Sequence, residues 1–361
     1  MAAAGVGRGR WASIAVVACV SIGAGAADPA PGGPDRLALV EETARGQDVV
    51  VIDVSRGTVT RAARGLTEID RLVWSPDGGR LALGAKSGNR DGIFIARTDG
   101  SALQRVADGR SPSWSPDGTR IAFAASQDGG EEVFVVRLDS GARDRLTTSP
   151  GRDITPLWGP DGTRIAFASG RGESSRLHGQ EYGTEIHLMG ADGSGARALT
   201  GGNACALATE SEGKLNSLDH ADWTPDGRRL LYRAGVCKMD CRVCVVDVDA
   251  GRTRPLVAER MVAAFTLAPD GRSVAYAWDR QILVSDLDGN GRRPLVQAGW
   301  GPAWSRDGRR IAFLTADEPD SAARRYHVET IEPDGRNRRR VTQRSGNYWG
   351  LAWAPVPTGR P

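Results

Sequence analysis

Trp114-Ser115-Pro116-Asp117-Gly118 is the stretch that decides the fold, because the chain returns to nearly the same five residues six more times. The seven copies begin at Trp74, Trp114, Trp158, Trp223, Leu267, Trp304 and Trp353. Their spacing runs from 37 to 65 residues, and five of the six intervals are shorter than 50. A repeat of this length is typical of arrays built from one supersecondary unit. The sequence therefore predicts a repeat architecture.

Each copy reads as a tight turn between two β-strands. Pro116 fixes φ at the second turn position, and Gly118 supplies the left-handed conformation that closes the turn. β-prone runs follow, such as residues 120–123 and 133–136, and a second Gly turn precedes a last short strand. Each unit is expected to be a four-stranded antiparallel meander, which must stack on its neighbours to bury its faces. Radial stacking of such sheets gives a β-propeller.

The two ends of the chain are expected to complete one unit. Trp353 ends a first strand with no room after it for three more, and residues 34–39 read like a second strand that lacks its first. Residues 49–53 and 58–60 supply the third and fourth strands. We therefore expect an all-β fold, a seven-bladed β-propeller of four-stranded antiparallel blades over residues 34–356. The C-terminal strand would join the N-terminal three and close the ring, which leaves no open edge.

The repeated turn motif resembles the TolB-type, WD-repeat-like propeller repeat, which also occurs in the tricorn and dipeptidyl-peptidase families. The resemblance covers about residues 34–356 and implies a fold rather than a function. The TolB protein carries an α/β domain before a six-bladed propeller, whereas this chain has no room for that domain and is expected to have seven blades. The peptidases carry a hydrolase domain with a Gly-x-Ser-x-Gly nucleophile elbow, and this sequence contains no such motif.

The N-terminus predicts export. Arg8 and Arg10 precede an apolar stretch over residues 11–27 that ends in small residues, as in a secretory signal peptide. We therefore expect a signal peptide over residues 1–27, a linker over 28–33, a short tail over 357–361, and a periplasmic or secreted protein. Cys19 loosely fits a lipoprotein processing site, so an outer-membrane lipoprotein anchored to the membrane at Cys19 is the alternative.

The net charge argues against nucleic-acid binding. Without Arg8 and Arg10, the formal charge falls from +3 to +1, because 45 basic residues face 44 acidic ones. The one basic run, residues 336–340, falls in an expected hairpin without aromatic neighbours for base stacking. We expect no nucleic-acid partner and a solvated turn at this run.

Four cysteines of the mature chain are expected to meet at one corner of the fold. Cys237 and Cys241 flank a hairpin, Cys244 follows in its second strand, and Cys205 lies in the loop that feeds this blade. In an exported protein an even number of cysteines first indicates disulfides, with a metal site or free thiols as alternatives. The first expected pair is Cys237 with Cys241, and the second joins Cys205 to the same hairpin. Cys244, further down the strand, is expected to be left out, or to pair only through movement of the loop.

Two long insertions are the expected home of any binding site. Residues 169–184 and 201–222 should lie on one face, together with a third loop over residues 315–325. Long loops on a rigid scaffold frequently carry function. The candidate ligand- or partner-binding residues in them are His178, Glu181, Tyr182, Asp219 and His220. The simpler interpretation is that both insertions are solvated decorations.

Motifs for catalysis are not found in this sequence, so no catalytic residue, metal ligand or cofactor is assigned. The aspartates of the repeated turns, such as Asp117, are too regular for a unique reaction and are expected to shape the turns. Residues 286–291 resemble the start of a calcium loop, but they fall where the repeat requires a hairpin turn.

The sequence therefore predicts a monomeric scaffold that binds an envelope protein or peptide, with carbohydrate as another candidate partner. The alternative is a hydrolase or lyase that acts on a sugar or peptide at the mouth of the channel.

Overall fold

The computed structural model describes most of the chain from Asp35 onward. The described residues are 35–149, 151–171, 176–177, 180–181, 185–201, 205, 216–234, 242–257, 259, 261–317 and 325–355. Every regular element in these ranges is a β-strand, which confirms the all-β fold class. The described residues contain no helix of the length and apolarity needed to cross a bilayer. The predicted signal peptide with Cys19, the linker and the tail lie outside the described residues.

Five sheets contain four antiparallel strands each. The first contains β7 (Arg110–Trp114), β8 (Arg120–Gln127), β9 (Gly130–Arg137) and β10 (Arg143–Arg145). The second contains β11 (Asp153–Trp158), β12 (Arg164–Ser169), β15 (Glu185–Gly190) and β16 (Arg197–Ala198). The third contains β17 (Asn216–Trp223), β18 (Arg229–Ala234), β19 (Arg242–Asp247) and β20 (Thr253–Pro255). The fourth contains β21 (Ala264–Leu267), β22 (Ser273–Trp278), β23 (Gln281–Asp286) and β24 (Arg293–Val296). The fifth contains β25 (Trp300–Trp304), β26 (Ile311–Ala316), β27 (Tyr326–Ile331) and β28 (Arg339–Arg340).

The sixth sheet joins the two ends of the chain. Its order is β29-β1-β2-β3-β4-β5-β6. The strands are β29 (Asn347–Trp353), β1 (Arg36–Thr43), β2 (Gly46–Asp53), β3 (Thr58–Trp74), β4 (Arg80–Ser87), β5 (Arg90–Arg97) and β6 (Leu103–Ala107). β29 pairs with β1, with Trp353 opposite Leu37. The 17-residue β3 pairs with β2 through its first half and with β4 through its second half.

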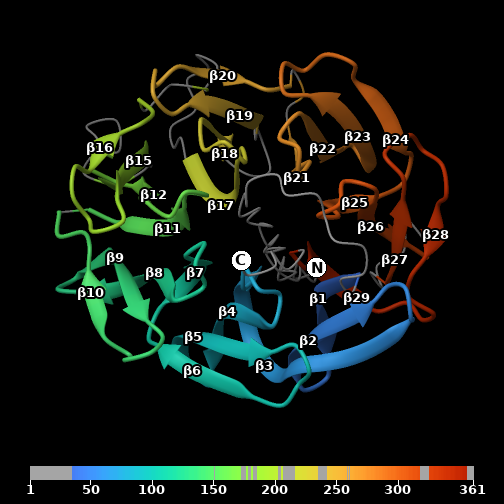
Figure 1. Cartoon of the computed structure of the whole chain (residues 1–361), viewed down its shortest axis with the longest axis horizontal. Helices are drawn as coiled ribbons and strands as arrows, with labels where there is room; N and C mark the ends of the chain where they lie inside the picture. The colour runs from blue at the N-terminus through green and yellow to red at the C-terminus, as the bar shows by residue number, and fades with distance from the viewer. Residues whose placement is uncertain are drawn as a thin grey trace, which may run out of the picture.

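The sheets lie around a common centre, as in a β-propeller (Figure 1). The first strand of each four-stranded sheet is innermost and the fourth is at the rim. Since successive strands are antiparallel, all Pro-Asp-Gly turns lie at one end of the sheets. We call that end the turn face. The opposite end, which carries the hairpins between second and third strands and the connections between sheets, is the loop face.

Each repeated turn forms as its sequence predicts. Gly118 has a φ of 68° and donates its N–H to the Ser115 carbonyl at 2.9 Å. Asp117 Oδ1 accepts a hydrogen bond from the Thr119 N–H at 3.0 Å. Burial of Asp117 opposes its ionisation, but hydrogen bonds from Ser115 and Thr119 hold its pKa below the usual value. The turn aspartates therefore serve turn geometry, as expected.

The repeated tryptophans are buried between adjacent sheets, and arginine covers them. Trp158 is 1% exposed and packs with Ala122 and Val133 of the preceding sheet. Arg120, also from that sheet, places its guanidinium 4.7 Å from the centre of the Trp158 ring. The same contact joins Arg36 to Trp74, Arg80 to Trp114, Arg164 to Trp223 and Arg310 to Trp353. Several of these arginines also donate to the glycine carbonyl of the next turn, as Arg80 does to Gly118 at 3.2 Å.

Two junctions lack this stacking, and both border the β21–β24 sheet. Arg229 faces a sheet whose repeat begins with Leu267 instead of tryptophan. On the other side, Ser273 occupies the position of the stacking arginine, before Trp304. At these junctions an inner strand still donates to its neighbour, since the Leu267 N–H binds Asp222 Oδ2 at 3.0 Å. The β21–β24 sheet therefore packs against both neighbours without the arginine–tryptophan contact that the other junctions share.

Replacing Trp158 with alanine should lower the free energy of unfolding by about 3–5 kcal/mol, because it leaves a cavity between two sheets. Trp353→Ala should cost a similar amount, since Trp353 is 7% exposed and donates from Nε1 to the Ala303 carbonyl at 2.9 Å. Denaturant unfolding of both variants beside the wild type measures the costs. Wild-type stability of either variant would contradict the inferred role of these tryptophans.

Candidate functional site

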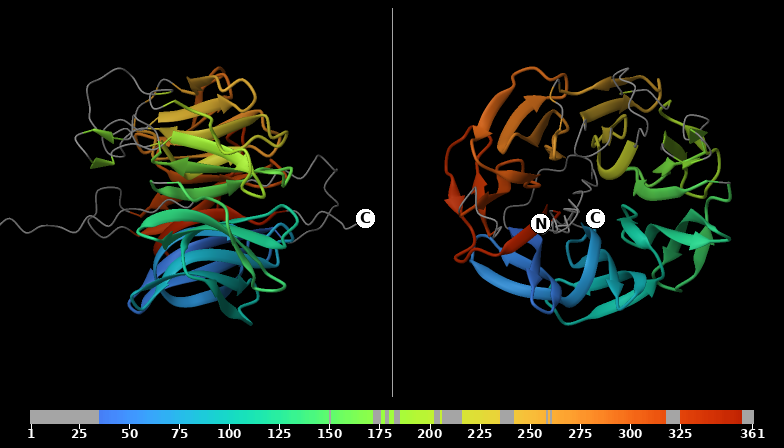
Figure 2. Two further views of the ribbon diagram at one scale, coloured as in Figure 1. Left: turned by 90° about the vertical axis from the view of Figure 1, so that its left-hand side faces the viewer. Right: turned by 180° about the vertical axis from the view of Figure 1, so that it is seen from behind.

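The five residues predicted to bind a ligand or partner fall in or beside the two insertions. His178 and Tyr182 lie outside the described residues. Glu181 ends β14 (Gln180–Glu181), which pairs with β13 (Arg176–Leu177) in a small hairpin that projects from the loop face (Figure 2). Asp219 and His220 lie in β17, the innermost strand of its sheet. Only the backbone of these three residues is described, so their role in binding stays a prediction.

The expected loop over residues 201–222 is partly wrong, because its last seven residues are strand. β17 begins at Asn216 and its pairing with β18 is irregular between Ser217 and Ala221. A bulge of this kind lets a strand continue across extra residues that break the simple alternation. The sequence pattern missed the strand for that reason, and Asp219 and His220 fall within the bulge.

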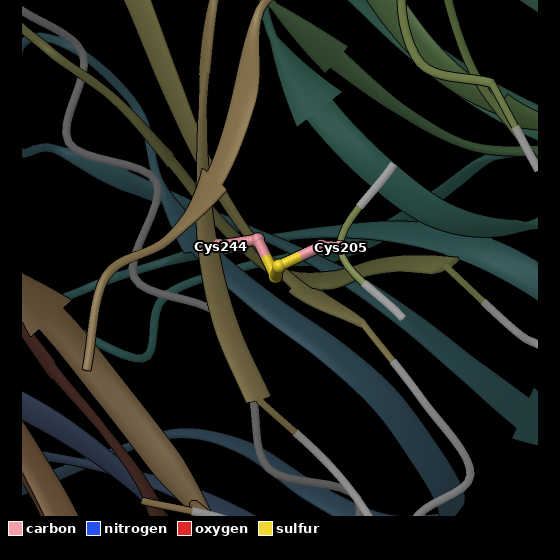
Figure 3. The surroundings of a disulfide bond; sticks show 2 residues. All are labelled: Cys205 and Cys244. Carbon is pink, nitrogen blue, oxygen red and sulfur yellow. A yellow bond between two sulfur atoms is a disulfide. The ribbon is translucent and has the colours of Figure 1, made fainter. Parts of the chain in front are cut away.

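A disulfide joins Cys205 to Cys244 (Figure 3). Their Cα atoms are 6.3 Å apart, within the usual range for a disulfide. Cys244 is therefore paired with the loop cysteine rather than left out. Cys205 is bonded to the predicted blade, but its partner is Cys244 rather than a cysteine that flanks the hairpin. Cys237 and Cys241 lie outside the described residues, so their predicted pairing stays a prediction.

The physical reason for this pairing lies in the packing between sheets. Cys244 is fully buried on β19, opposite Tyr232 of β18. Cys205 is 8% exposed and belongs to the same apolar cluster, between the β11–β16 and β17–β20 sheets. Cys205 therefore lies beside the third strand of the next sheet, within bonding distance of Cys244. Phe94 and Phe134 occupy the position equivalent to Cys244 on the third strands of two other repeats.

His187 replaces the same aromatic position in the β11–β16 sheet. It lies opposite Phe167, with ring centres 5.5 Å apart, and is 8% exposed. Neither ring nitrogen has a hydrogen-bond partner among the described residues, and Glu185 Oε2 is 3.7 Å from Nε2. Burial, followed by the charge of Arg171, lowers the pKa of His187, although Glu185 opposes the shift. His187 is therefore a neutral group at pH 7.

Two salt bridges lie at the loop-face end of the sheet that contains this histidine. Buried Asp153 accepts hydrogen bonds from Arg171 and from Ser169 Oγ, the latter at 2.6 Å. Arg152 binds Glu131 of the preceding sheet at 2.5 Å. The carboxylates of Asp153 and Glu131 are therefore both paired with arginines. Within the described ranges, no three His, Cys, Asp or Glu side chains are grouped as metal ligands would be.

His327, in contrast to His187, has a partner at each ring nitrogen. His327 Nε2 lies 2.6 Å from Asp317 Oδ1, and its Nδ1 lies 3.4 Å from the Thr342 hydroxyl. A hydrogen bond from Ser345 is the largest cause that lowers the pKa of Asp317, and His327 adds to it. Both ring nitrogens of His327 are therefore engaged, Nε2 by Asp317 after β26 and Nδ1 by Thr342 after β28.

An aromatic cluster that the sequence analysis did not single out lies on the loop face. Trp300 begins β25, Tyr326 begins β27 and Tyr348 lies near the start of β29, and we call these three residues the loop-face aromatic cluster. The rings of Trp300 and Tyr326 meet edge to face, with centres 5.7 Å apart. All three side chains are partly buried against one apolar cluster between the β25–β28 sheet and β29.

Backbone contacts fix the positions of these rings. The Tyr326 N–H donates to the Gly346 carbonyl at 2.8 Å, and the Gly346 N–H donates back at 3.0 Å. A Cβ at Gly346 would lie 2.5 Å from the Tyr348 ring, so a larger residue there would displace this ring. Burial, followed by the charge of Glu41, raises the pKa of Tyr348. The cluster is thus a preformed apolar surface with charged neighbours.

A sequence signal for this cluster existed. Trp278, Trp300 and Trp349 are the tryptophans after residue 27 that lie outside the repeated turn motif. They belong to β22, β25 and β29, which lie in successive sheets. Tryptophans that the repeat does not require are candidates for another role.

The turn interpretation of residues 286–291 is confirmed. Asp286 Oδ1 accepts hydrogen bonds from the Asp288 and Asn290 N–H groups at 2.9 and 2.7 Å, and Gly289 has a φ of 79°.

Comparison with protein families identifies this repeat. The family described as "TolB beta propeller domain" matches residues 107–299, which is more than half of the 361-residue chain. Among curated proteins, dipeptidyl-peptidase 5 of Porphyromonas endodontalis is 29% identical over 112 residues. The match covers 27% of this chain and 16% of that protein, so the chain spans only a small part of this curated relative.

Solved structures show the same fold at low sequence identity. TolB from Acinetobacter baumannii is 18% identical with a TM-score of 0.55, over 89% of this chain and 67% of that one. An oligogalacturonate lyase from Vibrio parahaemolyticus is 10% identical with a TM-score of 0.62, over 90% of each chain. A second oligogalacturonate lyase, in complex with manganese, is 14% identical with a TM-score of 0.62, over 88% of this chain and 89% of that one. Similarity at this level shows the fold alone.

Loss of the disulfide should lower the free energy of unfolding by about 2–4 kcal/mol, because the bond closes a loop between residues 39 apart in the sequence. The measurement compares the Cys205→Ala, Cys244→Ala double variant with the wild type in denaturant, with and without reductant. The matched control, Cys237→Ala with Cys241→Ala, should retain a Cys205–Cys244 peptide in a non-reducing map. Four free thiols in the exported protein would contradict the prediction.

Replacing His187 with phenylalanine should flatten the dependence of stability on pH. The unfolded chain protonates this histidine near pH 6.5, whereas the folded chain does so at lower pH. Wild-type stability should therefore be full above about pH 6.5 and fall as the pH drops below it, by up to about 1.4 kcal/mol per pH unit from this group. Denaturant unfolding between about pH 7.5 and 5 measures the slope. Equal slopes for both proteins would refute this role for His187.

Proposed function

The chain belongs to the TolB β-propeller domain family, and we propose that it is an exported scaffold that binds an envelope protein or peptide through its loop face. The observation that carries this proposal is the loop-face aromatic cluster. Tryptophan and tyrosine are enriched where protein interfaces concentrate their binding energy, because they combine large apolar surfaces with polar edges. Rings held by backbone hydrogen bonds lose little freedom on binding, which favours recognition.

The Cys205–Cys244 bond supports export and a rigid loop face. Disulfides persist in oxidising compartments such as the periplasm or the extracellular space. The bond fixes the connection that leads into β17 against its sheet. A periplasmic or secreted location fits this feature, with cleavage of a signal peptide over residues 1–27 and a linker over 28–33. Membrane anchoring at Cys19 is the alternative.

A seven-bladed ring over residues 34–356, followed by the tail, is part of this proposal. The six sheets of four or more strands give seven blades if β3 is shared between two of them, since its halves pair with different strands. The β1–β29 pairing then joins the ends of the ring. Comparison of Trp353→Ala with Trp158→Ala tests closure, because a tryptophan at an open end would contribute less than one at an internal junction.

A catalytic role is the alternative, as a hydrolase or lyase acting on a sugar or peptide. It is supported by the oligogalacturonate lyase fold, which covers 88% of this chain and 89% of the lyase bound to manganese. The scaffold is favoured here because His187 and His327, the two histidines whose side chains are described, are buried within sheets, and His327 is engaged by its neighbours.

A photocrosslinking side chain at exposed Arg344, beside Tyr348, should trap a discrete envelope protein in the native host. The same side chain at Arg97 on the turn face serves as the control and should not trap it. Trp300→Ala should weaken binding of the purified partner by at least about thirtyfold, if Trp300 is a central contact. The partner would be identified from the crosslinked product and its affinity measured by calorimetry.

Two outcomes would contradict this function. The first is capture from Arg97 but not from Arg344. The second is turnover of oligogalacturonate or of model peptides by the purified protein, with or without added manganese, which would instead support the enzyme.

A further inference from the structure

The turn face differs between the two sides of the molecule. In the β17–β20, β21–β24 and β25–β28 sheets, the residue after Asp-Gly is Arg228, Arg272 or Arg309. At the same position, the turns after β3, β7 and β11 carry glycine or threonine. The three arginines are exposed, and their sheets are neighbours (Figure 1). Their guanidinium groups form no hydrogen bond or ion pair with other described residues.

Arg229 adds a fourth guanidinium to this side. Its counterparts, such as Arg80 and Arg120, are partly buried because they stack on the tryptophan of the next sheet. Leu267 stands in place of that tryptophan, and Arg229 is exposed. Because Arg229 has no tryptophan to stack on, its guanidinium is exposed on the turn face. We call Arg228, Arg229, Arg272 and Arg309 the basic arc.

The aspartates of the turns offset only part of this charge. Asp226 Oδ1 is used inside its turn, where it accepts from the Thr224 hydroxyl at 2.6 Å and from the Arg228 N–H at 3.0 Å. In the turns between first and second strands, three aspartates, Asp226, Asp270 and Asp307, accompany the four arginines. The hairpins between third and fourth strands on the same face add exposed residues of both signs, among them Asp249, Asp288 and Asp334 with Arg252, Arg293 and Arg336. The carboxylates are short and held by the turn, whereas the guanidiniums end long side chains. A partner that approaches the face therefore meets the guanidiniums first.

The described chain also begins at this face. Asp35 forms an ion pair with Arg310, which follows Arg309 at the start of the strand after the turn. The 34 residues before Asp35 therefore join the fold beside the basic arc.

We propose that the basic arc docks the turn face on an anionic lipid bilayer. Arg228, Arg272 and Arg309 occupy equivalent positions in turns of the same type, and Arg229 follows Arg228, so all four lie on the turn face. The molecule is disc-shaped (Figure 2). A flat surface with many anionic headgroups can contact all of them at once. The inference rests on the proposed envelope location, but it concerns the face opposite the one proposed to bind a partner. The two interactions can therefore fail independently.

Cosedimentation with vesicles tests the proposal. The mature chain should bind vesicles of phosphatidylglycerol and phosphatidylcholine and should not bind phosphatidylcholine alone. Binding should weaken as salt rises, because exposed charges are screened. An arginine near an anionic membrane contributes about fivefold in affinity, so changing Arg228, Arg272 and Arg309 to glutamine should weaken binding by at least about tenfold.

The matched control removes the same charge from elsewhere. Arg45, Arg64 and Arg90 are exposed and lie away from the turn face, and their change to glutamine should leave vesicle binding within about twofold of the wild type. An unchanged melting temperature establishes that each variant is folded, and Arg229→Gln alone provides a milder second variant that should also weaken binding. Equal losses in both triple variants, or equal binding to neutral vesicles, would overturn the proposal. Binding to dextran sulfate without binding to vesicles would overturn it too, and would indicate a soluble polyanion.

Discussion

The stacking of an arginine on the tryptophan of the next sheet is the interaction on which this architecture depends. The tryptophan ends the first strand of one sheet, and the arginine begins the second strand of the sheet before it, as with Arg120 and Trp158. The guanidinium covers an aromatic ring that would otherwise meet water at the end of the core. One sheet therefore cannot complete its own motif. This dependence explains why Gly-x-Arg and tryptophan recur together, and why the junctions around Leu267 differ from the rest.

Because the turn face carries these contacts, the loop face is free to vary. The β13–β14 hairpin, the Cys205–Cys244 bond and the loop-face aromatic cluster all lie at or near that end, each in a different sheet. None of them interrupts the stacking on the other side. A separation between a uniform face and a variable one lets one scaffold support many recognition surfaces.

The sequence predicted what is encoded locally. The turn at Gly118 and the four-stranded sheets follow from short patterns and were found. It did not predict the partner of Cys244, because that depends on the path of a connection from another sheet. The aromatic cluster was missed for a similar reason, since Trp300 and Tyr348 are separated in sequence and pack against one apolar cluster only when β29 lies beside the β25–β28 sheet. For Asp219 and His220, the pattern indicated a loop because a bulge hides the strand.

The pairing of β29 with β1 has a consequence for how the chain matures. Trp353 meets Leu37 only after almost the whole polypeptide exists. Contacts between such distant segments form late, since the long intervening chain must first be ordered. During synthesis, one edge of β1 stays unpaired until β29 has been made. A protein whose final pairing is delayed in this way remains in an incompletely folded form, with one strand edge unpaired, until synthesis is almost complete.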